Sequence, residues 1–180
     1  RVTEDPYLAL LRSTMVRQMN KLPIFFSAPL LIVLVALALR VAMALWLPED
    51  VAWPDGHRYE QVAINLLDTK GFGSISQNRN SVPTQPILIA AVYSVFGKSY
   101  LALRISFAVL GAATVLLGYI LTKRLFGATP AVVAGLLLAV YPYYIYLSAL
   151  FEYPQTFFIF LMALFFLFLY RFMELGNKLV

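Results

Sequence analysis

The chain has 180 residues, of which 61% are hydrophobic and only 13% are charged. A soluble domain carries about a quarter of charged residues, so this composition excludes an ordinary soluble protein and predicts an integral membrane protein. The net charge of +5 is better explained by basic residues that anchor the cytoplasmic side of a membrane than by a nucleic-acid partner. With no cysteine and one histidine, disulfides, thiolate sites and histidine-rich metal sites are excluded.

Residues 1–22 predict a cytoplasmic amphipathic leader. Asp5 and Pro6 are suited to the start of a helix, and apolar and basic residues then alternate at helical spacing. This pattern is typical of a helix that lies on the membrane surface. The alternative is a solvated leader that becomes ordered only when it binds a partner. The apolar run that follows is too long for the core of a cleavable signal, and it is typical of a retained anchor.

Residues 23–180 predict an all-α, polytopic transmembrane domain. A bilayer core of roughly 30 Å requires about 20 apolar residues in a helix. Four stretches meet this requirement, at about 24–47, 101–121, 131–150 and 154–171.

The outer loop, residues 48–100, is polar and too long for a hairpin turn. Within it, an apolar face at helical spacing predicts a helix at about 57–68. A second helix is predicted at about 86–96, where Thr84 could cap its start and Gly97 could end it. Eleven residues cover only about 16 Å, so this helix is expected to lie at the membrane interface. The apolar face of the first helix consists of Tyr59, Val62, Ala63, Leu66 and Leu67.

The distribution of positive charge predicts the orientation. The leader, Lys123 with Arg124, and Arg171 with Lys178 fall on one side of a four-span topology. Because lysine and arginine concentrate on the cytoplasmic side, both termini are expected to be cytoplasmic. The loop at 48–100 and the turn near residue 152 then face outward together.

Two acids on that outer face are candidate catalytic residues. Asp55 lies in the first outer loop and Glu152 in the second outer turn, while Arg40 and Arg104 lie near the same boundary. Arginines bind phosphate through paired hydrogen bonds, and a carboxylate can accept a proton or hold a divalent cation. The pattern therefore predicts a site for a lipid phosphate. Metal dependence is open, with Asp55 as the candidate ligand.

Each of these residues also has a structural interpretation. Asp55 could cap the helix that follows it, and Glu152 could favour the start of the fourth span. Arg40 could extend its charged end toward the interface. His57, a further candidate for substrate binding, could be a solvated loop residue.

The motifs "PDGHRYEQVAINLLDTKGFG", "VPTQPILIAAVYSVFGKSYLALRISFAVLGAATV" and "LTKRLFG" occur in that order. Together they resemble the N-terminal part of polytopic GT-C glycosyltransferases, in the superfamily of dolichyl-phosphate-mannose protein mannosyltransferases and aminoarabinose transferases. The likeness covers roughly residues 30–170. The family's loop acid, its Tyr-x-x-x-Ala-x-x-Leu helix and its Ala-x-Arg opening match Asp55, Tyr59, Ala63, Leu66, Ala102 and Arg104, and Glu152 matches a later acid.

The resemblance implies a transferase that moves a sugar from a polyprenyl-phosphate carrier to an acceptor outside the cytoplasm, in a bacterial inner membrane. Tyr59 joins Arg104, Arg40 and His57 as a candidate for substrate binding. The expected partners of the protein are the lipid-linked sugar and membrane lipids, with other membrane subunits as a further candidate. The chain departs from many relatives, which carry a Pro-Gly-Tyr-Pro-like stretch where this one reads "PTQP". The alternative is a noncatalytic transmembrane subunit of a larger membrane complex.

Overall fold

The computed structural model describes residues 24–48, 54–68 and 83–179. Every regular element in these ranges is an α-helix, which confirms the predicted all-α class. The predicted leader at residues 1–22 lies outside the described residues.

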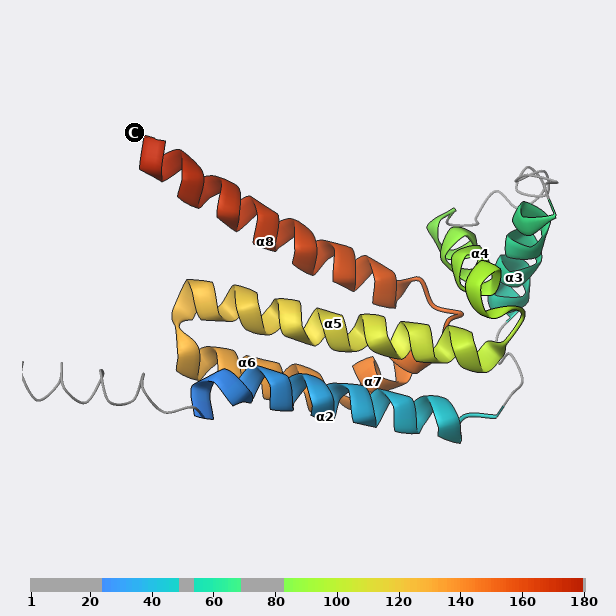
Figure 1. Cartoon of the computed structure of the whole chain (residues 1–180), viewed down its shortest axis with the longest axis horizontal. Helices are drawn as coiled ribbons and strands as arrows, with labels where there is room; N and C mark the ends of the chain where they lie inside the picture. The colour runs from blue at the N-terminus through green and yellow to red at the C-terminus, as the bar shows by residue number, and fades with distance from the viewer. Residues whose placement is uncertain (1–23, 49–53, 69–82, 180) are drawn as a thin grey trace, which may run out of the picture.

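Three long helices form most of the bundle. These are α2 (Ile24–Trp46), α5 (Tyr100–Phe126) and α8 (Gln155–Leu179). Each contains a stretch that is long and apolar enough to cross a membrane. In Figure 1, α2 and α5 run side by side, whereas α8 leans away from them toward its C-terminal end. The first, second and fourth predicted spans are therefore confirmed as helices.

The third predicted span, 131–150, is not one straight helix. It consists of α6 (Ala128–Val140) and α7 (Pro142–Ala149), which meet at an angle of 57°. Pro142 explains the break because it has no N–H to donate to the carbonyl of Leu138, four residues earlier. By length and composition, the described residues thus contain three candidate spans, or four if the bent pair is one span.

The loop predicted at residues 48–100 contains the two short helices that the sequence predicts. They are α3 (Pro54–Leu67) and α4 (Thr84–Phe96), and they pack against each other at one end of the bundle (Figure 1). Thr84 lies inside α4 and makes no cap, so that detail of the prediction is wrong. Gly97 does end the helix, with a φ of 73° that glycine adopts without strain.

Two buried clusters hold these helices together. The first lies between α2, α5 and α6 and includes Ile32, Val115 and Tyr119. The second joins α3, α4 and α5 to the turn before α8. Its members are Tyr59, Ala63, Ile89, Tyr93, Leu103, Phe107 and Phe151. Tyr59, Val62 and Ala63 of the predicted apolar face of α3 are therefore buried against the protein, whereas Leu67 at the end of the helix is exposed.

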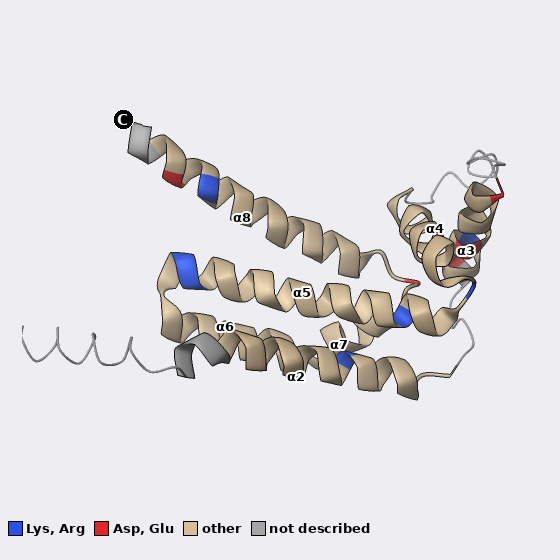
Figure 2. Cartoon of the chain, viewed as in Figure 1, with Lys and Arg blue, Asp and Glu red and all other residues tan. Residues whose placement is uncertain are grey.

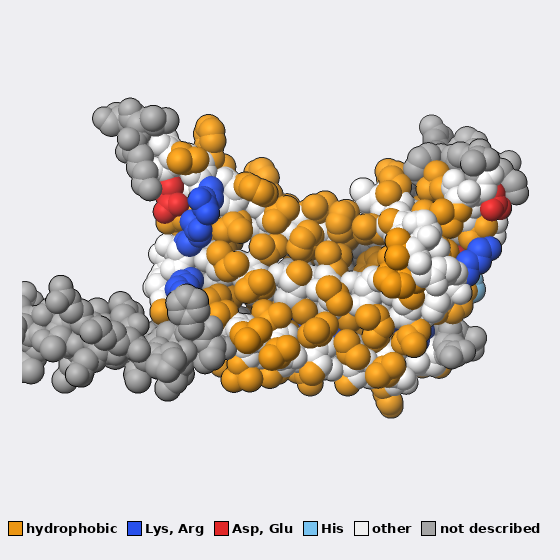
Figure 3. Space-filling view, viewed as in Figure 1, with side chains coloured by type: hydrophobic (Ala, Val, Ile, Leu, Met, Phe, Trp, Pro, Cys, Tyr) orange, Lys and Arg blue, Asp and Glu red, His pale blue; other side chains and the backbone are white. Residues whose placement is uncertain are grey.

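The surface matches this architecture. Exposed hydrophobic side chains cover the middle of the bundle in Figure 3, and charged side chains lie toward its two ends. Lys123 and Arg124 lie in the last turn of α5, and Arg124 pairs with Glu174 of α8 at 3.3 Å. Such an apolar band between charged ends is expected of a protein that crosses a bilayer.

Candidate functional site

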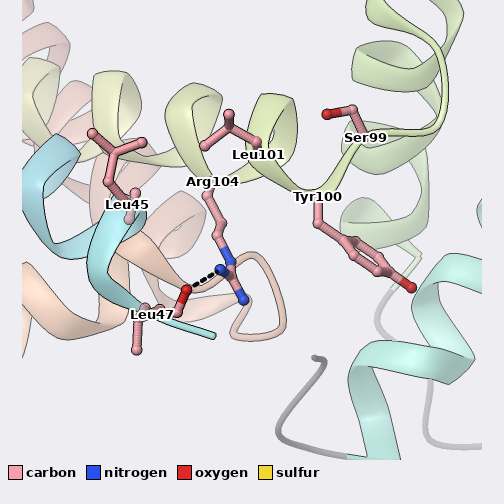
Figure 4. A pocket seen from close by; sticks show the side chains of 7 residues that line it. Leu45, Leu47, Ser99, Tyr100, Leu101 and Arg104 are labelled. Atoms are coloured by element: carbon pink, nitrogen blue, oxygen red, sulfur yellow. Dashed lines mark hydrogen bonds between the residues drawn. The ribbon is translucent and has the colours of Figure 1, made fainter. Parts of the chain in front are cut away.

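Arg104 lines a pocket between the end of α2 and the start of α5. The pocket has a volume of about 310 Å³ and is bordered by Leu45, Leu101 and Tyr100 among others. Figure 4 shows the guanidinium pointing toward the end of α2, where it donates to the carbonyl of Leu47 at 3.0 Å. A second hydrogen bond goes to the carbonyl of Pro48. The Nε of Arg104 is buried and has no hydrogen-bond partner among the described residues.

Arg40 lies inside the bundle, six residues before the end of α2. It is completely buried and donates to the carbonyls of Ala36, Leu138 and Ala139 at 2.9–3.2 Å. Its guanidinium also lies 5.0 Å from the centre of the Tyr144 ring. Two of these carbonyls belong to the end of α6, so Arg40 supplies donors where Pro142 interrupts the helix. The structure does not bring Arg40 into the pocket of Arg104.

Asp55 lies in the first turn of α3, one residue after its start at Pro54. Its carboxylate is exposed and pairs with Arg58 at 3.3 Å. An acid in the first turn favours the helix through its dipole, although Asp55 does not precede the helix as a cap would. His57 is exposed on the same helix, whereas Tyr59 is buried. Burial, followed by the charge of Asp55, raises the pKa of the Tyr59 phenol.

Glu152 lies in the short segment between α7 and α8 and is only 2% exposed. It does not lie in the first turn of α8, which begins at Gln155. The preceding Phe151 belongs to the same buried cluster as Tyr59. The segments that carry Asp55, Glu152 and Arg104 therefore gather near one end of the bundle (Figure 2).

Two residues at this end were not among the sequence candidates. Glu60 accepts hydrogen bonds from the hydroxyls of Tyr93 at 2.7 Å and Tyr100 at 2.8 Å. Gln85 is completely buried and donates to the carbonyl of Phe151. The only sequence signal for Gln85 was its place in "PTQP", where the chain departs from the family pattern. Glu60 lacked a signal because its partners lie 33 and 40 residues away.

The described residues contain no group of three or more His, Asp or Glu side chains that could hold a metal ion. Asp55 has Arg58 as its neighbour, and a cation beside it would compete with that guanidinium. A metal at Asp55 stays a prediction.

Fold and site together define a helical, integral membrane protein with a polar site at one end of its bundle. A sequence profile of the dolichyl-phosphate-mannose-protein mannosyltransferase family matches residues 80–179. This stretch is more than half of the chain, and the chain belongs to that family. The match indicates a membrane glycosyltransferase of the GT-C kind and a lipid-linked sugar donor.

The matched stretch includes Arg104 and Glu152, whereas Arg40, Asp55, His57 and Tyr59 lie before it. No curated protein and no solved structure matches the chain.

Proposed function

We propose that this chain forms part of a membrane glycosyltransferase that moves a sugar from a polyprenyl-phosphate carrier to an acceptor on the outer face of the membrane. The observation that carries the proposal is family membership over residues 80–179, together with a pocket in that stretch that Arg104 lines. A buried guanidinium next to a surface of leucines suits a ligand with an anionic head and an apolar tail.

The carrier phosphate would bind at Arg104. Leu45 and Leu101 are largely exposed beside the pocket and would contact the isoprenoid chain. Each terminal nitrogen of Arg104 carries two hydrogens and donates to one carbonyl, so the remaining hydrogens can donate to a phosphate oxygen in the pocket. Arg40 is a weaker candidate, since its terminal nitrogens donate to three carbonyls inside the bundle.

Asp55 would act as the general base. The acceptor hydroxyl oxygen would form a bond to the anomeric carbon of the sugar, and its proton would pass to the Asp55 carboxylate. The bond between that carbon and the phosphate oxygen would break, and the electron pair would leave with the phosphate at Arg104. Glu152 would be the second acid, accepting hydrogen bonds from the sugar hydroxyls. One displacement of this kind inverts the anomeric configuration.

The experiment that tests the proposal uses the complete protein in membranes, with a panel of polyprenyl-phosphate sugars as donors. Asp55→Asn should keep the folded yield and lower transfer by on the order of a hundredfold or more, because asparagine is a poor base. Asp68→Asn, a matched change at the other end of α3, should keep normal transfer.

Near-normal transfer by Asp55→Asn would contradict the general base. A complete wild-type protein that transfers no sugar from any donor would instead favour the noncatalytic subunit.

The proposed location is a bacterial inner membrane with both termini in the cytoplasm. The charged end of α5 supports this orientation, since Lys123 and Arg124 lie opposite the end that carries α3 and α4. Single cysteines at Lys98 and at Thr129, both exposed, test it in intact cells. A membrane-impermeant maleimide should label position 98 and not position 129. The reverse result would invert the topology.

A further inference from the structure

The segment between α7 and α8 is buried although it is not helical. Leu150, Phe151 and Glu152 are at most 2% exposed. Connecting segments usually run over the surface, because buried main-chain groups need hydrogen-bond partners. Something in the structure must therefore hold this segment in place.

The first contact is made by Gln85 of α4. Its side-chain amide donates to the carbonyl of Phe151, and the glutamine is completely buried. Thr156 fixes the same turn from the other side, since its hydroxyl donates to the carbonyl of Leu147 at 3.1 Å. A buried amide costs free energy unless it is hydrogen-bonded, and this bond from Nε2 offsets part of that cost, while Oε1 is buried without a partner among the described residues.

The second contact is made by Tyr100 at the start of α5. Its ring stacks on the ring of Phe151, with centroids 5.6 Å apart and planes 10° from parallel. Its hydroxyl donates to Glu60, which also accepts from Tyr93. Burial and the hydrogen bond to Glu60 raise the pKa of Tyr93, so this phenol stays protonated and donating at neutral pH.

We propose that Gln85 and Tyr100 are positioning residues that clamp Phe151 and thereby fix the carboxylate of Glu152, the next residue along the chain. Gln85 donates to the carbonyl of Phe151, and Tyr100 stacks on the Phe151 ring. The peptide group between Phe151 and Glu152 therefore has little freedom to rotate. Glu60 orients Tyr100 through its hydroxyl. The inference rests on the proposed function, because it assigns Glu152 a role in transfer that requires a fixed position.

Cysteine labelling tests the clamp without any assay of activity. The chain has no cysteine, so Glu152→Cys introduces its sole thiol. That buried thiol should react slowly with a maleimide. Adding Gln85→Leu should speed labelling about fivefold. The loss of one typical hydrogen bond raises the population of the open conformation, in which the thiol can react, by about that factor. Gln155→Leu, at an exposed glutamine in the first turn of α8, is the matched control and should leave the rate unchanged.

Two variants of Tyr100 separate the ring from the hydroxyl. Tyr100→Leu removes the stack and should speed labelling at position 152, whereas Tyr100→Phe keeps the ring and should have a smaller effect. These variants also decide the question if Gln85→Leu fails to fold. Unchanged labelling in both Gln85→Leu and Tyr100→Leu would overturn the clamp.

An activity experiment uses Gln85→Leu in the complete protein, with Glu152 unchanged. The kcat for transfer should fall at least tenfold while the KM for the carrier stays within about twofold, because Gln85 does not line the Arg104 pocket. An unchanged kcat would overturn the positioning role.

Failure of the proposed function gives a different result. Glu152→Gln with full transfer, or a wild-type protein without transfer, would remove that function and the catalytic part of this inference. The labelling experiment would still decide whether the clamp exists.

Discussion

Arg40 and Arg104 are both buried arginines that donate to main-chain carbonyls at the end of a helix, yet their surroundings differ. Arg40 of α2 lies against α6 and α7, where its guanidinium contacts carbonyls and the Tyr144 ring. Arg104 binds the end of α2 in a similar way but lines a pocket. The sequence predicts both arginines in one phosphate site, whereas only Arg104 lines the pocket in the structure.

The difference shows that main-chain carbonyls of the protein can accept from most of the donors of a buried arginine. At Arg40, the interrupted end of α6 already supplies acceptors for the charge, because Pro142 leaves the Leu138 carbonyl without its helical donor. The Nε is buried without a partner among the described residues in both arginines, but Arg104 donates to only two carbonyls and lines a pocket, which leaves donors of its terminal nitrogens for a ligand. The comparison can be tested by changing each arginine separately.

The largest effect on stability is expected for Arg40→Met. The methionine would leave the carbonyls of Leu138 and Ala139 without donors in a buried place, at about 1–3 kcal/mol for each group. The folded yield and the thermal midpoint in detergent should fall sharply. Arg104→Met should cost less, because water can reach the carbonyls of Leu47 and Pro48 through the pocket. Equal losses for the two variants would contradict the distinction.

A smaller effect, on substrate binding, is expected for Arg104→Lys. A lysine keeps the charge but loses the planar fork, so it cannot serve both the carbonyls and a phosphate. The KM for the polyprenyl-phosphate donor should rise about tenfold, which corresponds to roughly 1.4 kcal/mol. Arg171→Lys, on an exposed part of α8, is the control. An unchanged KM with unchanged stability would remove Arg104 from the proposed site.

The smallest effect is expected at Gly111, which faces Arg40 from α5. A Cβ at this position would lie 2.6 Å from the Cβ of Ser148 and 2.9 Å from the Nε of Arg40. Gly111→Ala should therefore destabilise the bundle by about 1 kcal/mol net, since crowding of roughly 1–3 kcal/mol exceeds the gain in helix propensity.

Gly118→Ala is the matched control on the same helix. Its Cβ would meet only the end of the Leu138 side chain, at 2.7 Å, and that side chain can rotate away. The thermal midpoint should stay near that of the wild type. A larger loss at Gly118 than at Gly111 would contradict the close packing around Arg40.

The helices could be predicted from the sequence because each leaves a local pattern. Apolar runs of about 20 residues marked α2, α5 and α8, and the spacing of Tyr59, Val62 and Ala63 marked the buried face of α3. The break at Pro142 left a signal too, since proline inside a helical run predicts a kink. The sequence prediction nevertheless ran the span through it.

The contacts of the candidate site could not be predicted in this way. Arg40 meets Ala139, 99 positions away, and Gln85 meets Phe151, 66 positions away. Hydrophobic spacing reports which face of a helix is buried and not which residue lies opposite. Asp55 and Glu152 could be proposed from their side of the membrane, but the separation of Arg40 from Arg104 depends on tertiary packing.

The bend between α6 and α7 also affects how far the turn that carries Glu152 lies from the other end of the bundle. The 13 residues of α6 rise about 20 Å, and the eight residues of α7, tilted by 57°, add only about 6 or 7 Å along the same axis. With α6 upright and starting at the inner boundary, the pair falls short of a hydrocarbon layer of roughly 30 Å by a few ångströms. The end of α7 would then lie slightly below the level of the lipid headgroups in the proposed orientation, and Glu152 follows three residues later. Under the proposed function, a site at that depth would favour acceptors that are themselves anchored in the membrane.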